Sequence, residues 1–322
     1  MPTSRRGALG ALATFALAPA LSQAQSYPTR PVRVVVPFAP GALTDTLGRI
    51  VAKHFQAALG QPFLVDNVAG GNSVVGTERI VKSAPDGYAL LVSATHVVAV
   101  PAVTPNMPYD TRRDLTPIAM LASTPLVLLV NPSVPANTPA EFVAYAKAQP
   151  KGLSYGSSGV GSSIHFAGSM LASATGAPLV HIPYQGSAKS ITDVIGGSIP
   201  SIFLDVGSAQ PLVGTGKVRA IGVTSLERSP LLPNVAPLSS VVPGFNIAAW
   251  YGLYGPAGLP KPIVLQLNRL AVEAVNSPEN TDIMIKRGNV PGNLDADQFA
   301  RFVSDELLKW ARIAKEANIK AE

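Results

Sequence analysis

Residues 32–59 read VRVVVPFAPGALTDTLGRIVAKHFQAAL and indicate a strand, a loop and a helix in direct succession. Residues 32–37 form a short valine-rich run, which is typical of a buried strand. From Asp45 to Leu59 the apolar residues recur at intervals of three and four, which is typical of an amphipathic helix. A strand that leads through a short loop into a helix begins a βαβ unit, so this stretch predicts an α/β fold with a mainly parallel sheet.

The same succession occurs a second time in the middle of the chain. In the first unit we expect strands at 32–37, 63–66 and 88–93 and helices at 45–59 and 73–83. In the second unit we expect strands at 152–156, 179–183 and 201–205 and helices at 162–174 and 187–196. Two similar units predict two lobes, each a mainly parallel sheet flanked by helices.

Two extended apolar runs, 125–131 (PLVLLVN) and 249–254 (AWYGLY), predict two hinge crossings between the lobes. We expect lobe 1 to comprise residues 27–124 and 250–322, and lobe 2 residues 125–249. The end of the chain predicts helices at 261–276, near 282–287 and from Ala296, the last with a reciprocal cap between Asp295 and Gln298. Lobes joined in this way close around a ligand by hinge motion.

The first 24 residues are typical of a secretory signal peptide. Arg5 and Arg6 form a basic region, residues 7–18 are apolar, and Ser22-Gln23-Ala24 is a cleavage site of the small-x-small type. A membrane anchor fits less well because the apolar stretch is short. We therefore expect an exported protein that is cleaved near Ala24. These residues leave open whether export follows the Sec or the twin-arginine route.

The composition excludes several classes of protein. The 322 residues contain no cysteine, which excludes disulfides and thiolate metal sites. Removal of Arg5 and Arg6 with the leader lowers the formal net charge from +6 to +4. The basic residues are neither clustered nor interleaved with aromatic ones, so we expect no nucleic-acid partner.

Two loops carry the pattern of a binding site, 37–45 (PFAPGALTD) and 155–165 (YGSSGVGSSIH). Each follows an expected strand and opens an expected helix, where free N–H groups and the helix dipole attract anions. The glycines allow close approach to the backbone, and four serines of the second loop add hydroxyl donors. One such loop in each lobe predicts a cleft for a small carboxylate. For either loop alone, an ordinary strand-to-helix turn remains the alternative.

Three side chains in these regions have more than one interpretation. Asp45 lies in the first turn of a helix, where it caps the helix, braces the turn or binds a ligand hydroxyl or ammonium group. His165 is one turn into the second helix and is either a pocket residue or a packing residue. Asp205 ends an expected strand at the cleft, where it faces the hinge or accepts a hydrogen bond from a neighbouring loop.

The chain lacks the common catalytic motifs. There is no G-x-S-x-G, no G-x-x-x-x-G-K-[ST] and no H-E-x-x-H, and none of the four histidines forms a pair at i, i+4. We therefore expect no enzyme activity, no cofactor and no metal site. A secreted hydrolase that uses a serine or His165 is the less favoured alternative.

Motifs spread over nearly the whole chain resemble a known family, the Bug-type extracytoplasmic receptors of tripartite tricarboxylate transporters. The resemblance rests on Tyr27-Pro28-Thr29-Arg30-Pro31, Pro37-Phe38-Ala39-Pro40-Gly41 with Asp45, Ala84-Pro85-Asp86-Gly87-Tyr88, Pro108-Tyr109-Asp110, Tyr155-Gly156-Ser157-Ser158-Gly159, His181-Ile182-Pro183-Tyr184 with Gly186-Ser187, Gly216-Lys217-Val218-Arg219-Ala220, and Gly255-Pro256-Ala257-Gly258.

This resemblance implies a type 2 periplasmic-binding-protein fold and a receptor role in transport, and we expect the exported protein to be a periplasmic monomer. The resemblance also implies a carboxylate held by the backbone of the two loops, often through water, and delivery to membrane permease subunits. A ligand sensor for a membrane kinase on the same scaffold is the alternative. The candidate ligand-binding residues are Phe38, Ala39, Pro40, Gly41, Ala42, Leu43, Asp45, Ser93, Thr95, Ser157, Ser158, Gly161, Ser162, Ser163, His165, Tyr184, Gly186 and Asp205.

The first loop departs from the pattern of that family, which has two or three glycines after the proline. Here Gly41 is followed by Ala42 and Leu43. The side chain of Leu43 points either to the pocket or to the core. In the pocket it would add an apolar wall, which favours a carboxylate with an aliphatic or aromatic body.

Overall fold

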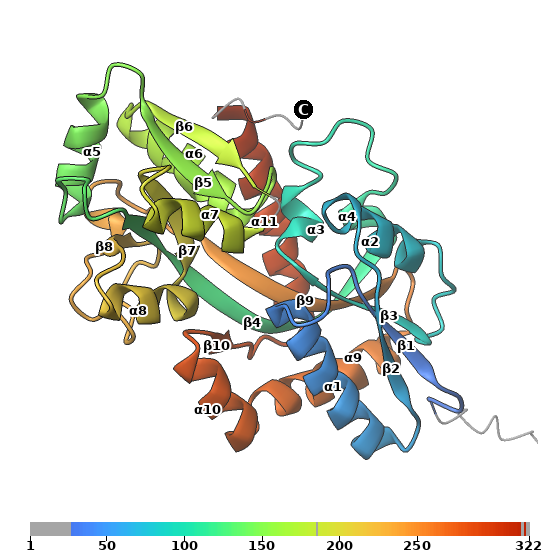
Figure 1. Cartoon of the computed structure of the whole chain (residues 1–322). Helices are drawn as coiled ribbons and strands as arrows, with labels where there is room; N and C mark the ends of the chain where they lie inside the picture. Colours follow the sequence, from blue (N-terminus) through green and yellow to red (C-terminus); the bar gives the residue numbers. More distant parts are fainter. Residues whose placement is uncertain (1–26, 185, 317–318, 320–322) are drawn as a thin grey trace, which may run out of the picture.

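The computed structural model describes residues 27–184, 186–316 and 319, so the expected signal peptide lies outside the described residues. The described strands form one ten-stranded mixed sheet with the order β2-β1-β3-β9-β4-β7-β5-β6, and β8 and β10 pair with β4. Helices flank this sheet (Figure 1). None of the described helices is both long and apolar enough to cross a bilayer.

The strands are β1 (Val32–Val36), β2 (Phe63–Asn67), β3 (Ala89–Ala94), β4 (Leu115–Val130), β5 (Leu153–Ser157), β6 (Leu179–Pro183), β7 (Ser201–Asp205), β8 (Arg219–Val223), β9 (Ala248–Pro256) and β10 (Val290–Pro291). The α-helices are α1 (Leu43–Leu59), α2 (Val74–Val81), α3 (His96–Ala99), α4 (Thr111–Asp114), α5 (Pro139–Lys147), α6 (Ser163–Thr175), α7 (Ser187–Ile195), α8 (Val206–Gly214), α9 (Lys261–Val275), α10 (Pro278–Lys286) and α11 (Ala296–Glu316). Two short 3-10 turns, η1 (Gly71–Ser73) and η2 (Leu238–Ser240), complete the described elements.

Two parallel units lie at the two ends of the sheet. Strand β1 pairs in parallel with β2 and β3, and β5 pairs in parallel with β6 and β7. Antiparallel β4 and β9 join these units in the middle of the sheet. We use "first lobe" for the unit around β1–β3 and "second lobe" for the unit around β5–β8. The residue limits expected for the lobes, 27–124 with 250–322 and 125–249, remain a prediction.

Strand β4 carries the chain from one lobe to the other. Its residues Leu115 to Pro125 pair with β9, and its residues Leu126 to Val130 pair with β7 and β8. The extended run expected at 125–131 is therefore the second part of a longer strand. The two lobes therefore share one continuous strand in their sheet.

The first lobe is buried on both faces of its sheet, which explains the valine run of β1. Val34 and Val36 belong to the apolar core that α1 and α9 cover, and Val35 belongs to the core on the opposite face. A strand covered on both sides is apolar throughout rather than alternating.

Helix α11 packs on β4, α3 and α6 and so touches both lobes. The ring of Trp310 meets Phe166 of α6 edge-on, with 4.5 Å between the ring centroids. Buried Glu306 accepts hydrogen bonds from Nε1 of Trp250 on β9 at 2.8 Å and from Nε1 of Trp310 at 2.7 Å. The Nζ of Lys309 lies 2.6 Å from the other oxygen of Glu306. One carboxylate therefore ties α11 to β9, the strand that begins at the junction of the lobes.

Candidate ligand-binding site

The first binding loop joins β1 to α1 and leaves the start of the helix without a side-chain cap. Ala42 is the N-cap residue and has no side chain that can accept a hydrogen bond. Residues 39–42 are exposed, and Gly41 has a left-handed φ of 88°. The start of α1 therefore has no side-chain acceptor of its own, and the binding of an anion at this loop stays a prediction.

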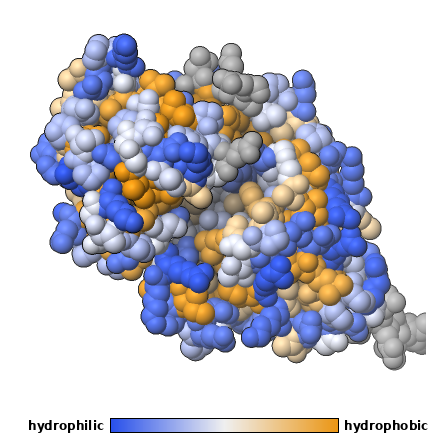
Figure 2. Space-filling model, in the orientation of Figure 1, coloured by the Kyte–Doolittle hydropathy of each residue, from blue (hydrophilic) through white to orange (hydrophobic). Residues whose placement is uncertain are grey.

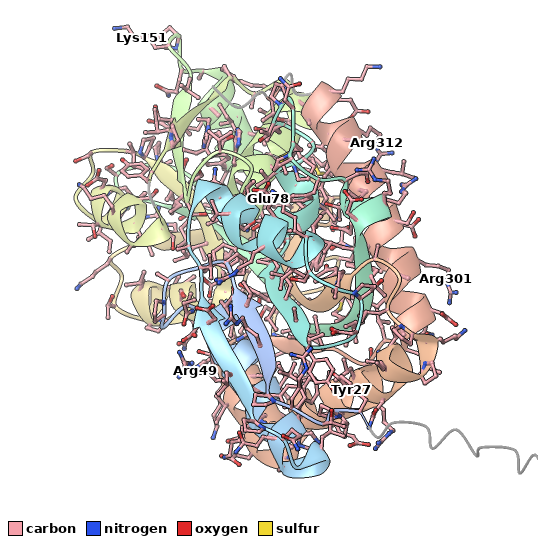
Figure 3. The ribbon with its side chains drawn as sticks, turned by 90° about the vertical axis from the view of Figure 1, so that its right-hand side faces the viewer. Tyr27, Arg49, Glu78, Lys151, Arg301 and Arg312 are labelled. Carbon is pink, nitrogen blue, oxygen red and sulfur yellow. The ribbon has the colours of Figure 1, made fainter. Side chains whose placement is uncertain are left out.

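Asp45 braces this loop from inside. Its carboxylate accepts hydrogen bonds from the Gly41 N–H at 3.0 Å, from Arg49 Nε at 3.1 Å and from Asn67 Nδ2 at 3.0 Å. The same Asn67 amide also donates to the carbonyl of Phe38 at 3.1 Å. Arg49 extends from α1 at the surface (Figure 3). Of the three roles considered for Asp45, the structure shows the brace.

Hydrogen bonding sets the ionisation of Asp45. Burial by itself would raise the pKa of this carboxyl, but the donors on Arg49, Gly41 and Asn67 outweigh burial and hold the pKa below its ordinary value. Asp45 is only 4% exposed and is charged at neutral pH. Its oxygens are occupied by the loop, and it contributes to a site by shaping the backbone.

Phe38 and Leu43 are half-buried and pack against the core that α1 and α9 cover. The apolar surface of Leu43 is thus shared with the core of the first lobe. Whether any part of it touches a ligand remains a prediction.

The second binding loop joins β5 to α6 and is braced by its own hydroxyl groups. Ser162 caps α6: its Oγ accepts from the His165 N–H at 3.2 Å and donates to the Gly159 carbonyl at 2.8 Å. The Oγ of Ser157 accepts from the Gly159 N–H at 3.0 Å. Ser163 is buried, and half-buried Ser158 makes no side-chain hydrogen bond to another described residue. Ser157 and Ser162 thus brace the loop through their own hydrogen bonds.

A stacked histidine pair supports the second loop. The rings of His165 and His181 lie 3.6 Å apart at an interplanar angle of 10°. His165 Nδ1 accepts from the Gly161 N–H at 3.3 Å, and His181 Nε2 lies 2.6 Å from Ser157 Oγ. Burial lowers the pKa of His181 to about 4, and burial together with the neighbouring imidazole lowers the pKa of His165 to about 3. Both rings are neutral at pH 7, which fits Nδ1 as an acceptor.

This pair predicts acid sensitivity. Histidines in the unfolded chain take up protons near pH 6.5, whereas the folded pair resists protonation until about pH 4. Its contribution to stability is therefore complete above pH 7 and is lost as the pH falls toward 4. We expect the melting temperature of the ligand-free protein to fall over this range, and His181→Gln to make the fall shallower. His54→Gln, at a partly exposed histidine outside the pair, is the control for the loss of a histidine elsewhere in the protein. If the melting temperature falls equally steeply with pH in all three proteins, the histidine pair is not the source of the acid sensitivity.

Of the other candidates, Thr95, Tyr184 and Asp205 are held by neighbouring residues. The Thr95 hydroxyl bonds the backbone of Trp250, accepting from its N–H at 2.9 Å. Tyr184 donates to Asp193 at 2.9 Å, and Asp205 caps α8 by accepting from the Ser208 N–H at 2.8 Å. Gly186 precedes α7 with a φ of 103°, and the buried Ser93 hydroxyl has no partner among the described residues. Thr95 and Asp205 thus have structural partners, and their roles toward a ligand remain predictions.

A third strand-to-helix loop, residues 68–73 between β2 and α2, was missing from the candidates. Its Asn72 Nδ2 lies 3.5 Å from the carbonyl of Val160 in the second binding loop. That loop also lies against α3 and the residues after it, since a Cβ on Gly161 would sit 3.3 Å from a methyl group of Val100. The sequence Gly70-Gly71-Asn72 carries the same signal as the two chosen loops and could have been recognised.

The space between the lobes forms a visible hollow. Figure 2 shows this hollow at the centre of the molecule, bordered by both lobes. Among the described residues no group of three His, Asp or Glu side chains could hold a metal ion. What the loops present is backbone N–H groups, hydroxyls and apolar surface, which suits the binding of an anion.

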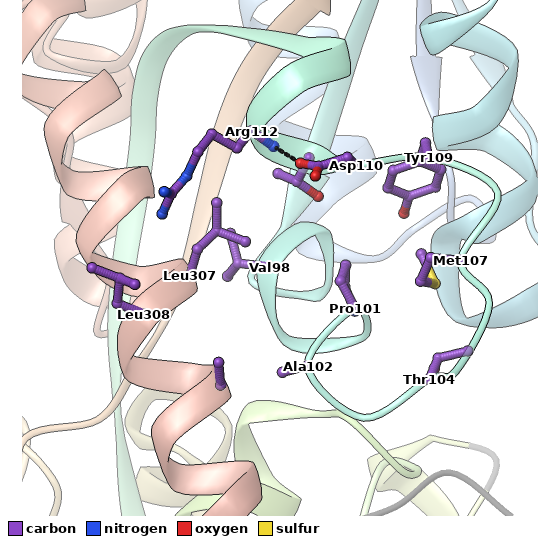
Figure 4. Close-up of a pocket in the computed structure, with 12 residues that line it drawn as sticks. Val98, Pro101, Ala102, Thr104, Met107, Tyr109, Asp110, Arg112, Leu307 and Leu308 are labelled. Atoms are coloured by element: carbon purple, nitrogen blue, oxygen red, sulfur yellow. Dashed lines mark hydrogen bonds between the residues drawn. The ribbon is translucent and has the colours of Figure 1, made fainter.

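A separate pocket of about 390 Å³ lies between α11 and the segment around α3 and α4 (Figure 4). Apolar side chains such as Val98, Pro101 and Leu307 line it, and Asp110 accepts from the Arg112 N–H at its rim. Neither binding loop contributes to this pocket, so it is distinct from the hollow between the lobes.

Comparison with known proteins identifies the family. Residues 47–319 match the family model TctC, the tripartite tricarboxylate transporter family receptor. The chain belongs to this family. Members of the family are solute-binding receptors rather than enzymes, so the resemblance and the absence of catalytic function are both confirmed.

Three solved structures are similar to this receptor over nearly their whole length. R. palustris Rpa4515 with adipate is 31% identical with a TM-score of 0.81, covering 91% of this chain and 99% of the other. The periplasmic binding protein BugD is 29% identical with a TM-score of 0.78, covering 92% and 100%. MatC from Rhodopseudomonas palustris with bound malate is 28% identical with a TM-score of 0.78, covering 89% and 99%. The receptor has the α/β periplasmic-binding-protein fold, as the sequence predicts.

Proposed function

We propose that this receptor binds a small aliphatic dicarboxylate between its two lobes, with one carboxylate at each binding loop. The observation that carries the proposal is the exposed loop at residues 39–42, which leads into α1 with no side-chain cap at the start of the helix. The second loop, in the other lobe, opens α6 at a braced, glycine-rich turn. Two relatives of known structure hold adipate and malate, both dicarboxylates.

We further propose that the receptor works as a periplasmic monomer and delivers its ligand to permease subunits in the membrane. Membership of the transporter receptor family supports a membrane partner. The leader expected at residues 1–24 and the periplasmic relative BugD support the location. Deletion of the gene should abolish uptake of the bound acid by whole cells. Uptake that persists would favour a sensor on the same scaffold.

A thermal-shift screen of mono-, di- and tricarboxylates tests the ligand class. A ligand at 100 times its dissociation constant stabilises the folded state by about 2.7 kcal/mol, which gives a clear shift in melting temperature. We expect adipate or an acid of similar length to give a large shift. A screen in which no carboxylate raises the melting temperature would overturn the proposal.

Esterification should weaken binding because it removes the charge that a helix start recognises. A hydrogen bond to a charged group contributes roughly 1.5–3 kcal/mol, so monomethyl adipate should bind about 10- to 100-fold more weakly than adipate. Titration calorimetry of the two compounds measures this ratio. Pimelate, one methylene longer with both charges retained, is the control for size. Equal affinities for adipate and its monomethyl ester would mean that the protein recognises only one end of the ligand as a charged carboxylate.

A further inference from the structure

We propose that Asn72 is a positioning residue that fastens the first lobe to the second binding loop and slows release of the ligand. This inference rests on the proposed function, since it concerns the same cleft. Asn72 lies in η1 of the first lobe, and its Nδ2 lies 3.5 Å from the carbonyl oxygen of Val160 in the second lobe. The bond joins residues that are 88 positions apart in the sequence.

The surroundings of Asn72 place it on the second binding loop. A Cβ built on Gly159 would lie 4.0 Å from Asn72 Oδ1, so the oxygen and the nitrogen of the amide both face this loop. On its other side η1 contacts α3, which packs in turn on α11. The amide thus extends from a supported segment of one lobe to the anion-binding turn of the other.

The length of this bond suits a latch. A distance of 3.5 Å is longer than the usual range of an N–H···O bond, which is about 2.7–3.2 Å. A small closing movement of the lobes would shorten the bond and strengthen it. Ligand and latch would then favour the same closed arrangement, so the loss of the latch should appear mainly in the rate of ligand release.

The backbone at Asn72 argues that the side chain has a role. Asn72 has φ 51° and ψ 50°, and Ser73 has φ 77°, so two residues other than glycine lie in the left-handed region in succession. Such a conformation is uncommon for residues with a side chain, although asparagine adopts it more readily than most, and it is unstrained for glycine. The two preceding residues, Gly70 and Gly71, are glycines with positive φ. Strain of this kind gathers at ligand clamps and switch segments, where the side chain compensates for it.

A buried polar group beside Asn72 points to the same place. Ser73 is 1% exposed, and its Oγ has no hydrogen-bond partner among the described residues. Buried hydroxyl groups in folded proteins usually have a hydrogen-bond partner. The segment that carries the latch therefore also has unused capacity for hydrogen bonding.

Two substitutions test the latch. Asn72→Gly keeps the left-handed backbone without strain and removes the amide. Asn72→Asp keeps the size and tolerates the backbone, but a carboxylate cannot donate to the Val160 carbonyl. The matched control is Asn106→Gly, because Asn106 is an exposed asparagine with φ 56° and makes no cross-lobe bond among those observed. Asn72→Asp should have the melting temperature of the wild type. The two glycine variants should melt at that temperature or above it.

The probe is adipate, and its release is followed by stopped-flow tryptophan fluorescence. We expect Asn72→Gly and Asn72→Asp to release adipate about fivefold faster, with association rates within twofold of wild type and Asn106→Gly unchanged. The second readout is amide hydrogen exchange of residues 158–162 in the ligand-free proteins. Exchange should be faster than wild type in both Asn72 variants and unchanged in Asn106→Gly. Exchange needs no ligand, so it decides on the contact even if adipate fails to bind and the proposed function is wrong. Asn72 variants that match Asn106→Gly in exchange and in release would overturn the inference.

Discussion

Asp45→Ala is expected to lower the free energy of unfolding by about 2–3 kcal/mol and to weaken carboxylate binding at least tenfold. The substitution leaves the Gly41 N–H, the Asn67 amide and the Arg49 guanidinium without their common acceptor. Loss of one hydrogen bond to a buried charge costs roughly 1.5–3 kcal/mol, and the exposed Arg49 recovers part of its loss from water. Binding suffers further because Asp45 shapes the loop that presents the start of α1. Chemical denaturation and calorimetry measure the two effects.

Asp282→Ala is the matched control for this prediction. Asp282 and Lys286 also form an i, i+4 pair, at 2.6 Å, but both side chains are exposed on α10. Removal of such a surface pair should cost only about 0.3–0.5 kcal/mol and leave binding intact. If the two variants lose equal stability, Asp45 acts as an ordinary surface charge and the brace is not needed.

The effect of Asp45→Ala should also depend on pH. The folded-state pKa of Asp45 is lower than that of an unfolded aspartate, so its contribution is present at neutral pH and is lost as the pH falls below about 4. The difference in stability between wild type and Asp45→Ala should therefore shrink in acid. A difference that stays constant from pH 7 to pH 3 would show that the charge of Asp45 is not what matters.

Local pattern was enough to predict much of the fold. The strand, loop and helix of residues 32–59 are present because β1 is covered on both faces and α1 buries one stripe. The reciprocal cap of the last helix is confirmed, with Asp295 and Gln298 each accepting from the backbone N–H of the other. Signals of this kind act over three or four residues, and the sequence displays them directly.

Elements that contradict their local pattern were missed. The 16-residue β4 contains Pro117, Ser123 and Thr124, so only its last part reads as a strand. Helix α8 continues through Pro211, which normally ends a helix. Helix α1 begins at Leu43, two residues before the expected start, because its N-cap is an alanine and gives no capping signal. In each case tertiary packing overrides the local preference.

The supports of the site depend on contacts between distant segments. Asn67, which holds Asp45, lies at the end of the neighbouring strand β2, 22 residues away. His181 reaches His165 because β6 pairs with β5 in the register that sets His181 opposite Tyr155. Register and strand order are not visible in a single sequence. The loops could therefore be predicted as binding elements, whereas the side chains that hold them in shape could not.

Glu306→Ala is expected to have the largest effect on stability, about 3–5 kcal/mol. The substitution leaves the indole N–H groups of Trp250 and Trp310 buried without their acceptor, and each such group costs roughly 1–3 kcal/mol. These are the two tryptophans of the chain, so their fluorescence reports the change directly. Glu306→Gln keeps a carbonyl oxygen and should lose less. Asp305→Ala, at an exposed neighbour on α11, should stay within about 0.5 kcal/mol of wild type.

The same substitution should reach the binding site, because α11 is packed against both lobes. Trp310 contacts Phe166, which follows His165 directly in α6, so a loosened Trp310 removes support from the second binding loop. We expect Glu306→Ala to bind adipate several-fold more weakly at a temperature where it is still fully folded. A cavity of about 420 Å³ borders Trp250 and Glu306 and could admit water to the indole N–H groups. A stability loss below 1 kcal/mol would mean that water replaces the carboxylate there, and that α11 is held by its aromatic contacts alone.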